Sequence, residues 1–143
     1  MAMSKKVLVA DDDENVRKSH LFALEAASDN LKIPFDVMQV SDSVAALQKI
    51  RSQRFDLILL DNDFKDKDLP GHLPGIALLQ LARKEGANQH TPIVFCSAET
   101  FETLAPMVER YQGVTFPKVD MDLNKSSRLF ADLLTRPLEA PSS

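Results

Sequence analysis

Acidic side chains come directly after two apolar runs of the sequence. Asp11 and Asp12 follow the first run, and Asp61 and Asp63 follow the most hydrophobic one. Carboxylates held together repel one another, which raises their pKa and costs stability unless a cation neutralises them. Such hard oxygen ligands suit Mg²⁺, which takes one or two carboxylates and completes its octahedron with water and phosphate oxygens. A carboxylate can also be the nucleophile that forms an acyl phosphate.

Two further polar residues follow apolar runs in the second half of the chain. Ser97 comes after residues 93–96, and Lys118 comes after residues 114–117. A hydroxyl can donate a hydrogen bond to a phosphoryl oxygen, and an ammonium group supplies a point charge. Both residues also have an ordinary interpretation: Ser97 could be a strand-end hydroxyl and Lys118 a solvated surface lysine. Asp13 is assigned to helix capping, which fully explains an acid at that place.

The apolar runs alternate with amphipathic stretches. The runs are predicted to be strands at residues 7–10, 35–40, 55–60, 92–96 and 114–116. Helices are expected at residues 14–27, after Asp42, at 76–85, at 100–112 with a break or kink at Pro106, and from Leu123 to Leu134. Residues 28–34 and 61–74 are expected to be loops. Five strands alternating with five helices predict an α/β fold with a doubly wound parallel sheet.

In such a sheet, ligands bind beyond the carboxyl ends of the strands. The acids, Ser97 and Lys118 all follow strands, so they are expected to meet at one edge. This set of residues favours a site with a bound metal ion, a nucleophile, and a hydroxyl and an ammonium group that hold an anion. His20, His72 and His90 have no ligand spacing and are expected to be structural or surface residues.

Composition narrows the class of protein. The 143 residues are 44% hydrophobic and carry a net charge of −4, which is typical of one globular domain. We expect a single domain over 1–143, with a core at about 5–136 and a flexible tail at 137–143. No sequence-wide basic field favours direct binding to nucleic acid or to a membrane surface. No signal peptide or membrane span is recognised, so a cytoplasmic location is expected. Cys96 lies in an apolar run and is expected to be buried.

Three segments, each a strand with the residues after it, resemble a known family. VLVADDDE at residues 7–14, FDLILLD at 55–61 and IVFCSAE at 93–99, together with Lys118, resemble the receiver domains of bacterial response regulators, including the single-domain chemotaxis receiver. The resemblance spans about residues 5–136. It implies a flavodoxin-like fold with a five-stranded parallel sheet of strand order 2-1-3-4-5 and helices on both faces.

The resemblance also implies roles for the site residues. Asp12 and Asp61 would contact Mg²⁺ directly, Asp11 would do so through water, and the main-chain carbonyl of Asp63 would be a further ligand. Asp61 would accept a phosphoryl group that is held by Ser97 and Lys118. The donor would be a phosphohistidine on a sensor histidine kinase or a histidine phosphotransfer protein. The chain would assist its own phosphorylation and dephosphorylation rather than act as an enzyme on other substrates. Its output would be a downstream protein or a homodimer, bound through the face of the fourth helix, fifth strand and fifth helix.

Several positions depart from the family pattern. Phe64 and Lys65 replace a Met-Pro pair, and the glycine expected soon afterwards corresponds to Gly75, which implies an insertion of roughly half a dozen residues. Val119 follows Lys118 in place of proline, and Thr115 occupies the position of an aromatic switch residue. These departures leave open a phosphorylation-independent receiver-like scaffold. A second alternative is a haloacid-dehalogenase-type phosphatase, in which Asp63 would be the general acid after Asp61.

Overall fold

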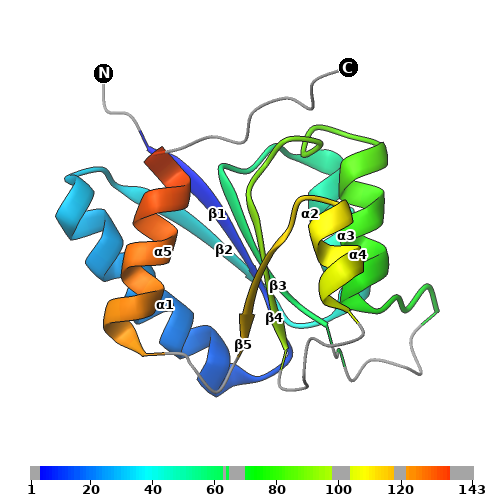
Figure 1. Ribbon diagram of the computed structural model, residues 1–143, viewed down its shortest axis with the longest axis horizontal. Helices are drawn as coiled ribbons and strands as arrows, with labels where there is room; N and C mark the ends of the chain where they lie inside the picture. Colours follow the sequence, from blue (N-terminus) through cyan, green and yellow to red (C-terminus); the bar gives the residue numbers. More distant parts are fainter. Residues whose placement is uncertain (1–3, 63, 65–69, 98–103, 118–121, 136–143) are drawn as a thin grey trace.

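The sheet has the topology that the sequence predicts. The computed structural model describes residues 4–62, 64, 70–97, 104–117 and 122–135. Its five strands are all parallel and lie in the order β2-β1-β3-β4-β5 (Figure 1). They are β1 Lys5–Ala10, β2 Phe35–Val40, β3 Leu57–Asp61, β4 Ile93–Ser97 and β5 Val114–Pro117. The flavodoxin-like fold and its strand order are therefore confirmed.

The central strands are buried on both faces of the sheet, as their uninterrupted apolar sequences predict. In β1, Val7 and Val9 contribute to one hydrophobic core, and Leu8 and Ala10 contribute to the other. Every residue of β3 is buried, whereas β2 has only half-buried and exposed positions because it lies at an edge. The sheet therefore separates two apolar cores. The acidic residues lie at the carboxyl ends of its strands.

Helices cover both faces of the sheet. Figure 1 shows α1 Glu14–Leu31 and α5 Leu123–Thr135 on one side, and α2 Ser43–Ser52, α3 Gly75–Lys84 and α4 Ala105–Arg110 on the other. The buried face of α5 follows helical spacing, with Phe130 and Leu134 facing the core that also contains Leu24 of α1. Within the described part of the chain, no helix has the length and apolar composition needed to cross a membrane.

The first helix is longer than its sequence pattern suggests. The loop expected at 28–34 is wrong over its first half, because α1 continues to Leu31. Lys32 then takes a left-handed conformation with φ of 57°, and the amides of Lys32 and Ile33 both donate to the Ser28 carbonyl. These bonds satisfy the end of the helix. The polar residues of this last turn gave no apolar pattern from which a helix could be predicted, although Leu31 packs against the core.

Pro106, at which the sequence predicts a break or kink in the helix, lies at the start of α4. Helix α4 begins at Ala105, so Pro106 lies in its first turn. A proline is tolerated there because the amide it lacks would have no partner within the helix. The earlier part of the expected helix, residues 100–103, lies outside the described residues.

A buried amide joins three segments at the amino-terminal end of the sheet. The Asn88 Oδ1 atom accepts hydrogen bonds from the Phe55 amide at 2.8 Å and from the Thr91 hydroxyl at 3.0 Å. Its Nδ2 atom donates to the carbonyls of Ile50 and Gln53, both at 2.7 Å. Asn88 thus satisfies its full hydrogen-bonding capacity inside the protein.

Arg83 performs a related role between α3 and α4. Its Nε donates to the Tyr111 carbonyl at 2.7 Å, and its Nη1 donates to the Thr91 carbonyl at 2.7 Å. Further bonds reach the carbonyls of Asn88, Gln89 and Gln112. Burial lowers the pKa of Arg83 from its usual range to about 10, which leaves the group charged at neutral pH. Residues far apart in sequence are thereby joined at the end of the sheet away from the acids.

Candidate functional site

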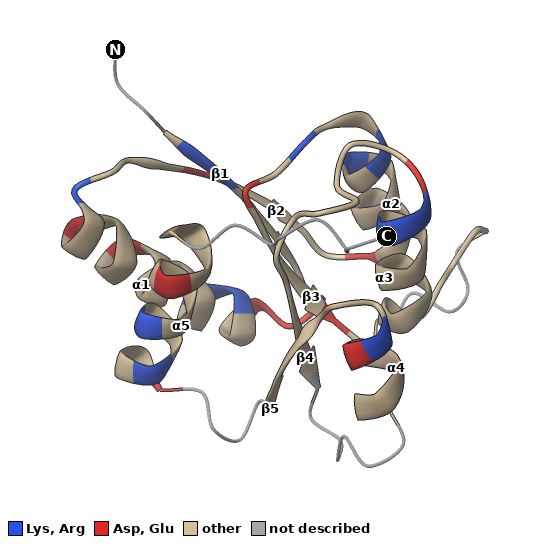
Figure 2. Ribbon diagram, turned by 45° about the horizontal axis from the view of Figure 1, so that its top comes forward, with Lys and Arg blue, Asp and Glu red and all other residues tan. Residues whose placement is uncertain are grey.

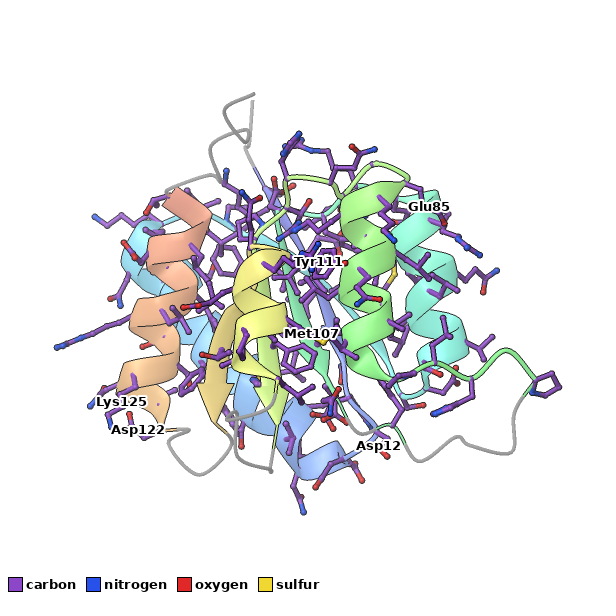
Figure 3. All side chains as sticks on the ribbon, turned by 45° about the vertical axis from the view of Figure 1, so that its right-hand side comes forward. Asp12, Glu85, Met107, Tyr111, Asp122 and Lys125 are labelled. Atoms are coloured by element: carbon purple, nitrogen blue, oxygen red, sulfur yellow. The ribbon has the colours of Figure 1, made fainter. Side chains whose placement is uncertain are left out.

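Three aspartates from two strands meet at the carboxyl end of the sheet. Asp11, Asp12 and Asp61 each offer a carboxylate oxygen, and these oxygens lie within 4.8 Å of one another. Asp11 and Asp61 are each 1% exposed, while Asp12 is half-buried. Figure 3 shows Asp12 at this end of the molecule and Glu85, at the end of α3, at the opposite end. The structure therefore brings together the acids that the sequence places after β1 and β3.

The turn between β1 and α1 holds Asp11 in place. The Asp11 Oδ1 atom accepts the Asp13 amide at 2.9 Å, and the Arg17 Nη1 atom donates to the Asp11 carbonyl at 2.8 Å. Asp13 caps α1, since its side chain accepts from the amides of Asn15 and Val16. Its prediction as a capping residue is confirmed. Figure 2 marks this turn as acidic, with basic residues close by in α1.

Backbone hydrogen bonds fix the position of Asp61. It is the last residue of β3 and pairs with Cys96 of β4, and the next amide, that of Asn62, donates to the Cys96 carbonyl at 3.1 Å. The Asn62 carbonyl in turn accepts the Gly75 amide at 3.0 Å. A Cβ at position 75 would overlap the Asp61 carbonyl oxygen. Only glycine therefore allows α3 to begin this close to the candidate nucleophile.

The structure describes the remaining candidates to different extents. Ser97 ends β4, where it pairs with Pro117 of β5, so its backbone lies at the same edge of the sheet as Asp61. Its side chain, together with Asp63 and Lys118, lies outside what the structure describes. Thr115 is a half-buried residue of β5 and pairs with Phe95. Cys96 is buried as expected.

The long segment after Asp61 is anchored by residues that the sequence reasoning missed. Phe64 is 2% exposed and belongs to the core beneath α2 and α3. The Ser43 hydroxyl, at the start of α2, accepts the Leu73 amide at 3.1 Å and lies 3.4 Å from His72 Nδ1. The only sequence signal for this contact was a serine in the first turn of a helix, a common position that specifies no distant partner.

His20 is structural, as predicted. It is 2% exposed, and its ring meets that of Phe130 edge to face with centroids 5.8 Å apart. Its Nε2 atom lies 3.9 Å from the Cys96 sulfur. From α1, the residue therefore packs against α5 and β4, beneath the strand end that carries Ser97.

The acidic cluster has the donor chemistry of a magnesium site. Two ligands on opposite sides of an octahedral Mg²⁺ are roughly 4.2 Å apart, which is twice the usual bond length. The three oxygens lie within 4.8 Å of one another, a bound slightly wider than this span, so they gather around one position. The burial of Asp11 and Asp61 also makes a cation favourable, because closely spaced buried carboxylates are costly without one. The residues present therefore fit a small divalent cation.

Comparisons with known proteins point to one family. The family model of the response regulator receiver domain matches residues 7–113. No curated protein matches the chain in sequence. The receiver domain of Francisella response regulator 1452 is 26% identical, with a TM-score of 0.68 over 92% of this chain and 98% of that chain.

Two other solved structures show the same fold at lower identity. A CheY-like receiver domain protein from Methanospirillum hungatei is 17% identical, with a TM-score of 0.73 over 93% of this chain and 95% of that one. The receiver domain of Thermotoga maritima DrrB, solved in a BeF3-activated form, is 16% identical, with a TM-score of 0.66 over 94% of this chain and 100% of that one.

The family match covers both acidic strand ends and the strand that leads to Ser97. The same segments carried the resemblance in the sequence, and their order along the chain is that of the receiver family rather than the phosphatase alternative. With the sheet order 2-1-3-4-5 and the acids gathered at its carboxyl edge, these findings establish that the chain belongs to the response regulator receiver domain family.

Proposed function

We propose that this protein is a phosphoryl-accepting module of a two-component or phosphorelay system, with Asp61 as the acceptor. The observation that carries the proposal is the meeting of Asp11, Asp12 and Asp61 within 4.8 Å at the end of a buried sheet. Asp61 lies at the end of the central strand, and main-chain bonds on both sides of it limit its movement. A fixed carboxylate beside a cation site is a suitable nucleophile towards phosphorus.

The other site residues are assigned complementary roles. Asp12 and Asp61 would bind Mg²⁺ directly, Asp11 would bind through water, and the Asp63 main-chain carbonyl would be a further ligand. When bound, the ion would offset the charge that gathers between carboxylate and phosphoryl oxygens. The Ser97 hydroxyl would donate to one phosphoryl oxygen, and the Lys118 ammonium would pair with another.

The transfer is a displacement at phosphorus. An Asp61 carboxylate oxygen forms a bond to the phosphorus atom of a phosphohistidine as the bond from phosphorus to the imidazole nitrogen breaks. The released imidazole keeps the electron pair and takes up a proton. In hydrolysis, water attacks the phosphorus of the acyl phosphate, and Asp61 is restored as a carboxylate. The protein thus assists chemistry on its own side chain.

The partners follow from this chemistry. The donor would be a sensor histidine kinase or a histidine phosphotransfer protein in the cytoplasm. The output would be a downstream protein, or a second copy of the chain, that docks on the face of α4, β5 and α5. Met107 of α4 is 38% exposed and gives this face an apolar contact point.

The experiment is phosphorylation by a small donor. Wild-type protein is incubated with acetyl phosphate and MgCl₂, and intact mass spectrometry follows the addition of one phosphoryl group. We expect saturable modification that chelation of Mg²⁺ prevents and that Asp61→Asn abolishes. Asp36→Asn is the matched control, because Asp36 is an exposed aspartate of the edge strand β2. Modification that persists in Asp61→Asn would exclude Asp61 as the acceptor.

A receiver-like scaffold remains a second candidate because of Thr115. This half-buried residue of β5 is a small side chain where the family has an aromatic switch residue. The two functions differ in their response to beryllium fluoride, a mimic of the phosphoryl group. If it shifts the amide NMR signals of α4, β5 and α5, the protein is a switch. If the shifts stay at the acidic cluster, the scaffold is favoured.

A further inference from the structure

A cavity of about 590 Å³ lies at the amino-terminal end of the sheet, away from the acids. Its apolar lining consists of buried side chains from three parts of the chain, Phe55, Pro92 and Leu134 among them. The Asn88 and Arg83 hydrogen bonds described above hold the loop that forms one wall, at residues 86–92. The volume falls within the range of small-molecule sites.

The charge of the lining is predominantly basic. Lys5, Arg54 and His90 all line the cavity, and none of the three takes part in an ion pair within the described residues. Asp56 is the one acid among the described lining residues, and its Oδ2 atom accepts the Lys6 amide at 2.8 Å. Figure 2 shows the basic start of β1 at this end of the sheet. The protein as a whole carries a net charge of −4, so the basic character of this hollow differs from the overall charge of the chain.

We propose that this cavity binds a small organic anion, a molecule with an aromatic or aliphatic body and one carboxylate, phosphate or sulfonate group. The apolar body would lie on Phe55, Pro92 and Leu134, and the anionic group would face Lys5 and Arg54. Cationic side chains around an apolar floor satisfy both parts of such a ligand, whereas a neutral molecule gains nothing from the charges. The site shares no residue with the acidic cluster.

The test compares two aromatic probes of similar size. Anilinonaphthalene sulfonate carries the anionic group, and N-phenylnaphthylamine has a similar ring framework without it. We expect saturable binding of the sulfonate at one site, followed by fluorescence, and binding of the neutral probe that is weaker by roughly tenfold or more. Amide NMR shifts caused by the sulfonate should fall on residues 54–56 and 86–92 and on the end of α5.

Variants then test the role of the charges. Replacing Lys5 and Arg54 together by Gln should weaken binding of the sulfonate by roughly tenfold and leave the neutral probe unaffected. The matched control replaces Lys125 and Arg128 by Gln, which removes the same charge from the exposed surface of α5 near its start. Circular dichroism and thermal unfolding confirm that both variants are folded. Equal binding of the two probes, NMR shifts away from the cavity, or an equal loss of affinity in the control would overturn the proposal.

Discussion

Gly75, the first residue of α3, packs directly against the main chain of Asp61. A Cβ at position 75 would overlap the Asp61 carbonyl oxygen and lie 2.7 Å from the Asn62 Cα atom. The Gly75 amide also donates to the Asn62 carbonyl. The start of a helix on one face of the sheet therefore packs against the main chain that carries the candidate phosphoacceptor.

Gly75→Ala should reduce both stability and phosphorylation. The added methyl group must push α3 away from β3, a kind of overpacking that costs about 1–3 kcal/mol. Urea unfolding measures that cost, and the acetyl phosphate reaction measures the displacement of Asp61. Gly71→Ala is the control, because Gly71 has φ of 85° but an added Cβ would meet nothing closer than 3.9 Å. It should lose about 1 kcal/mol of stability and keep its rate of phosphorylation. Equal rate losses in both variants would refute a specific role for Gly75.

Mg²⁺ should stabilise the protein through Asp12. A ligand that binds only the folded state adds roughly 2.7 kcal/mol at a hundredfold excess over its dissociation constant. Thermal unfolding with and without MgCl₂ should show this increase in the wild type and lose most of it in Asp12→Asn. The neighbouring Asp13→Asn should retain the response, because asparagine caps a helix as well as aspartate does. A full magnesium response in Asp12→Asn would contradict the proposed ligand set.

Arg83→Met should lower the free energy of unfolding by about 2–4 kcal/mol, because several partly buried carbonyls lose their donor. Arg83→Lys should recover part of that loss, since an ammonium group cannot reproduce the planar fork. Lys84→Met, at the next and exposed position, is the control.

The pH dependence of the Arg83 effect follows from its lowered pKa. Burial holds the folded-state pKa at about 10, below the usual range of an arginine. Arg83 is therefore protonated in both states below about pH 9, and it adds no slope to stability there. Above about pH 10 the folded state loses its proton first, so the cost of burying the charge declines as pH rises. Urea unfolding should accordingly give the same difference between wild type and Arg83→Met at about pH 6 and pH 9.

Asn88→Asp should be strongly destabilising even though the two side chains have the same shape. The introduced carboxylate would face the carbonyls of Ile50 and Gln53, which now accept the Asn88 amide hydrogens. We expect a loss of about 3–5 kcal/mol at neutral pH. Burial raises the pKa of the new carboxyl above its unfolded value of about 3.9, so the loss should shrink towards about pH 4 as the group is protonated. Denaturant unfolding at the two pH values measures the difference, and a larger loss at the lower pH would contradict this account.

The sequence predicted the parts of the protein that leave a periodic or positional signal. The buried strands and the acids after them could be predicted because the sequence shows an apolar run followed by Asp11, Asp12 or Asp61. The family resemblance then gave the strand order. Gly75 was recognised as a family position, but its packing against Asp61 became clear only from the structure.

The misses have a common physical origin in long-range or capping contacts. The last turn of α1 depends on bonds from Lys32 and Ile33 to Ser28, and a left-handed lysine carries no sequence signature. The side chains of Arg83 and Asn88 bond to carbonyls of distant segments, and a carbonyl is present in every residue. Such contacts cannot be predicted from residue types alone.

The hydrogen bond between the Gly75 amide and the Asn62 carbonyl joins the two ends of the segment 63–74. Residues 63–74 leave and return at a fixed pair of atoms, so their number does not alter where Asp61 lies. Lengthening a closed loop is inexpensive, since each doubling adds only about 0.6 kcal/mol. This junction is consequently a suitable place to graft a foreign peptide, and it explains how an insertion could enter a receiver without displacing its acceptor.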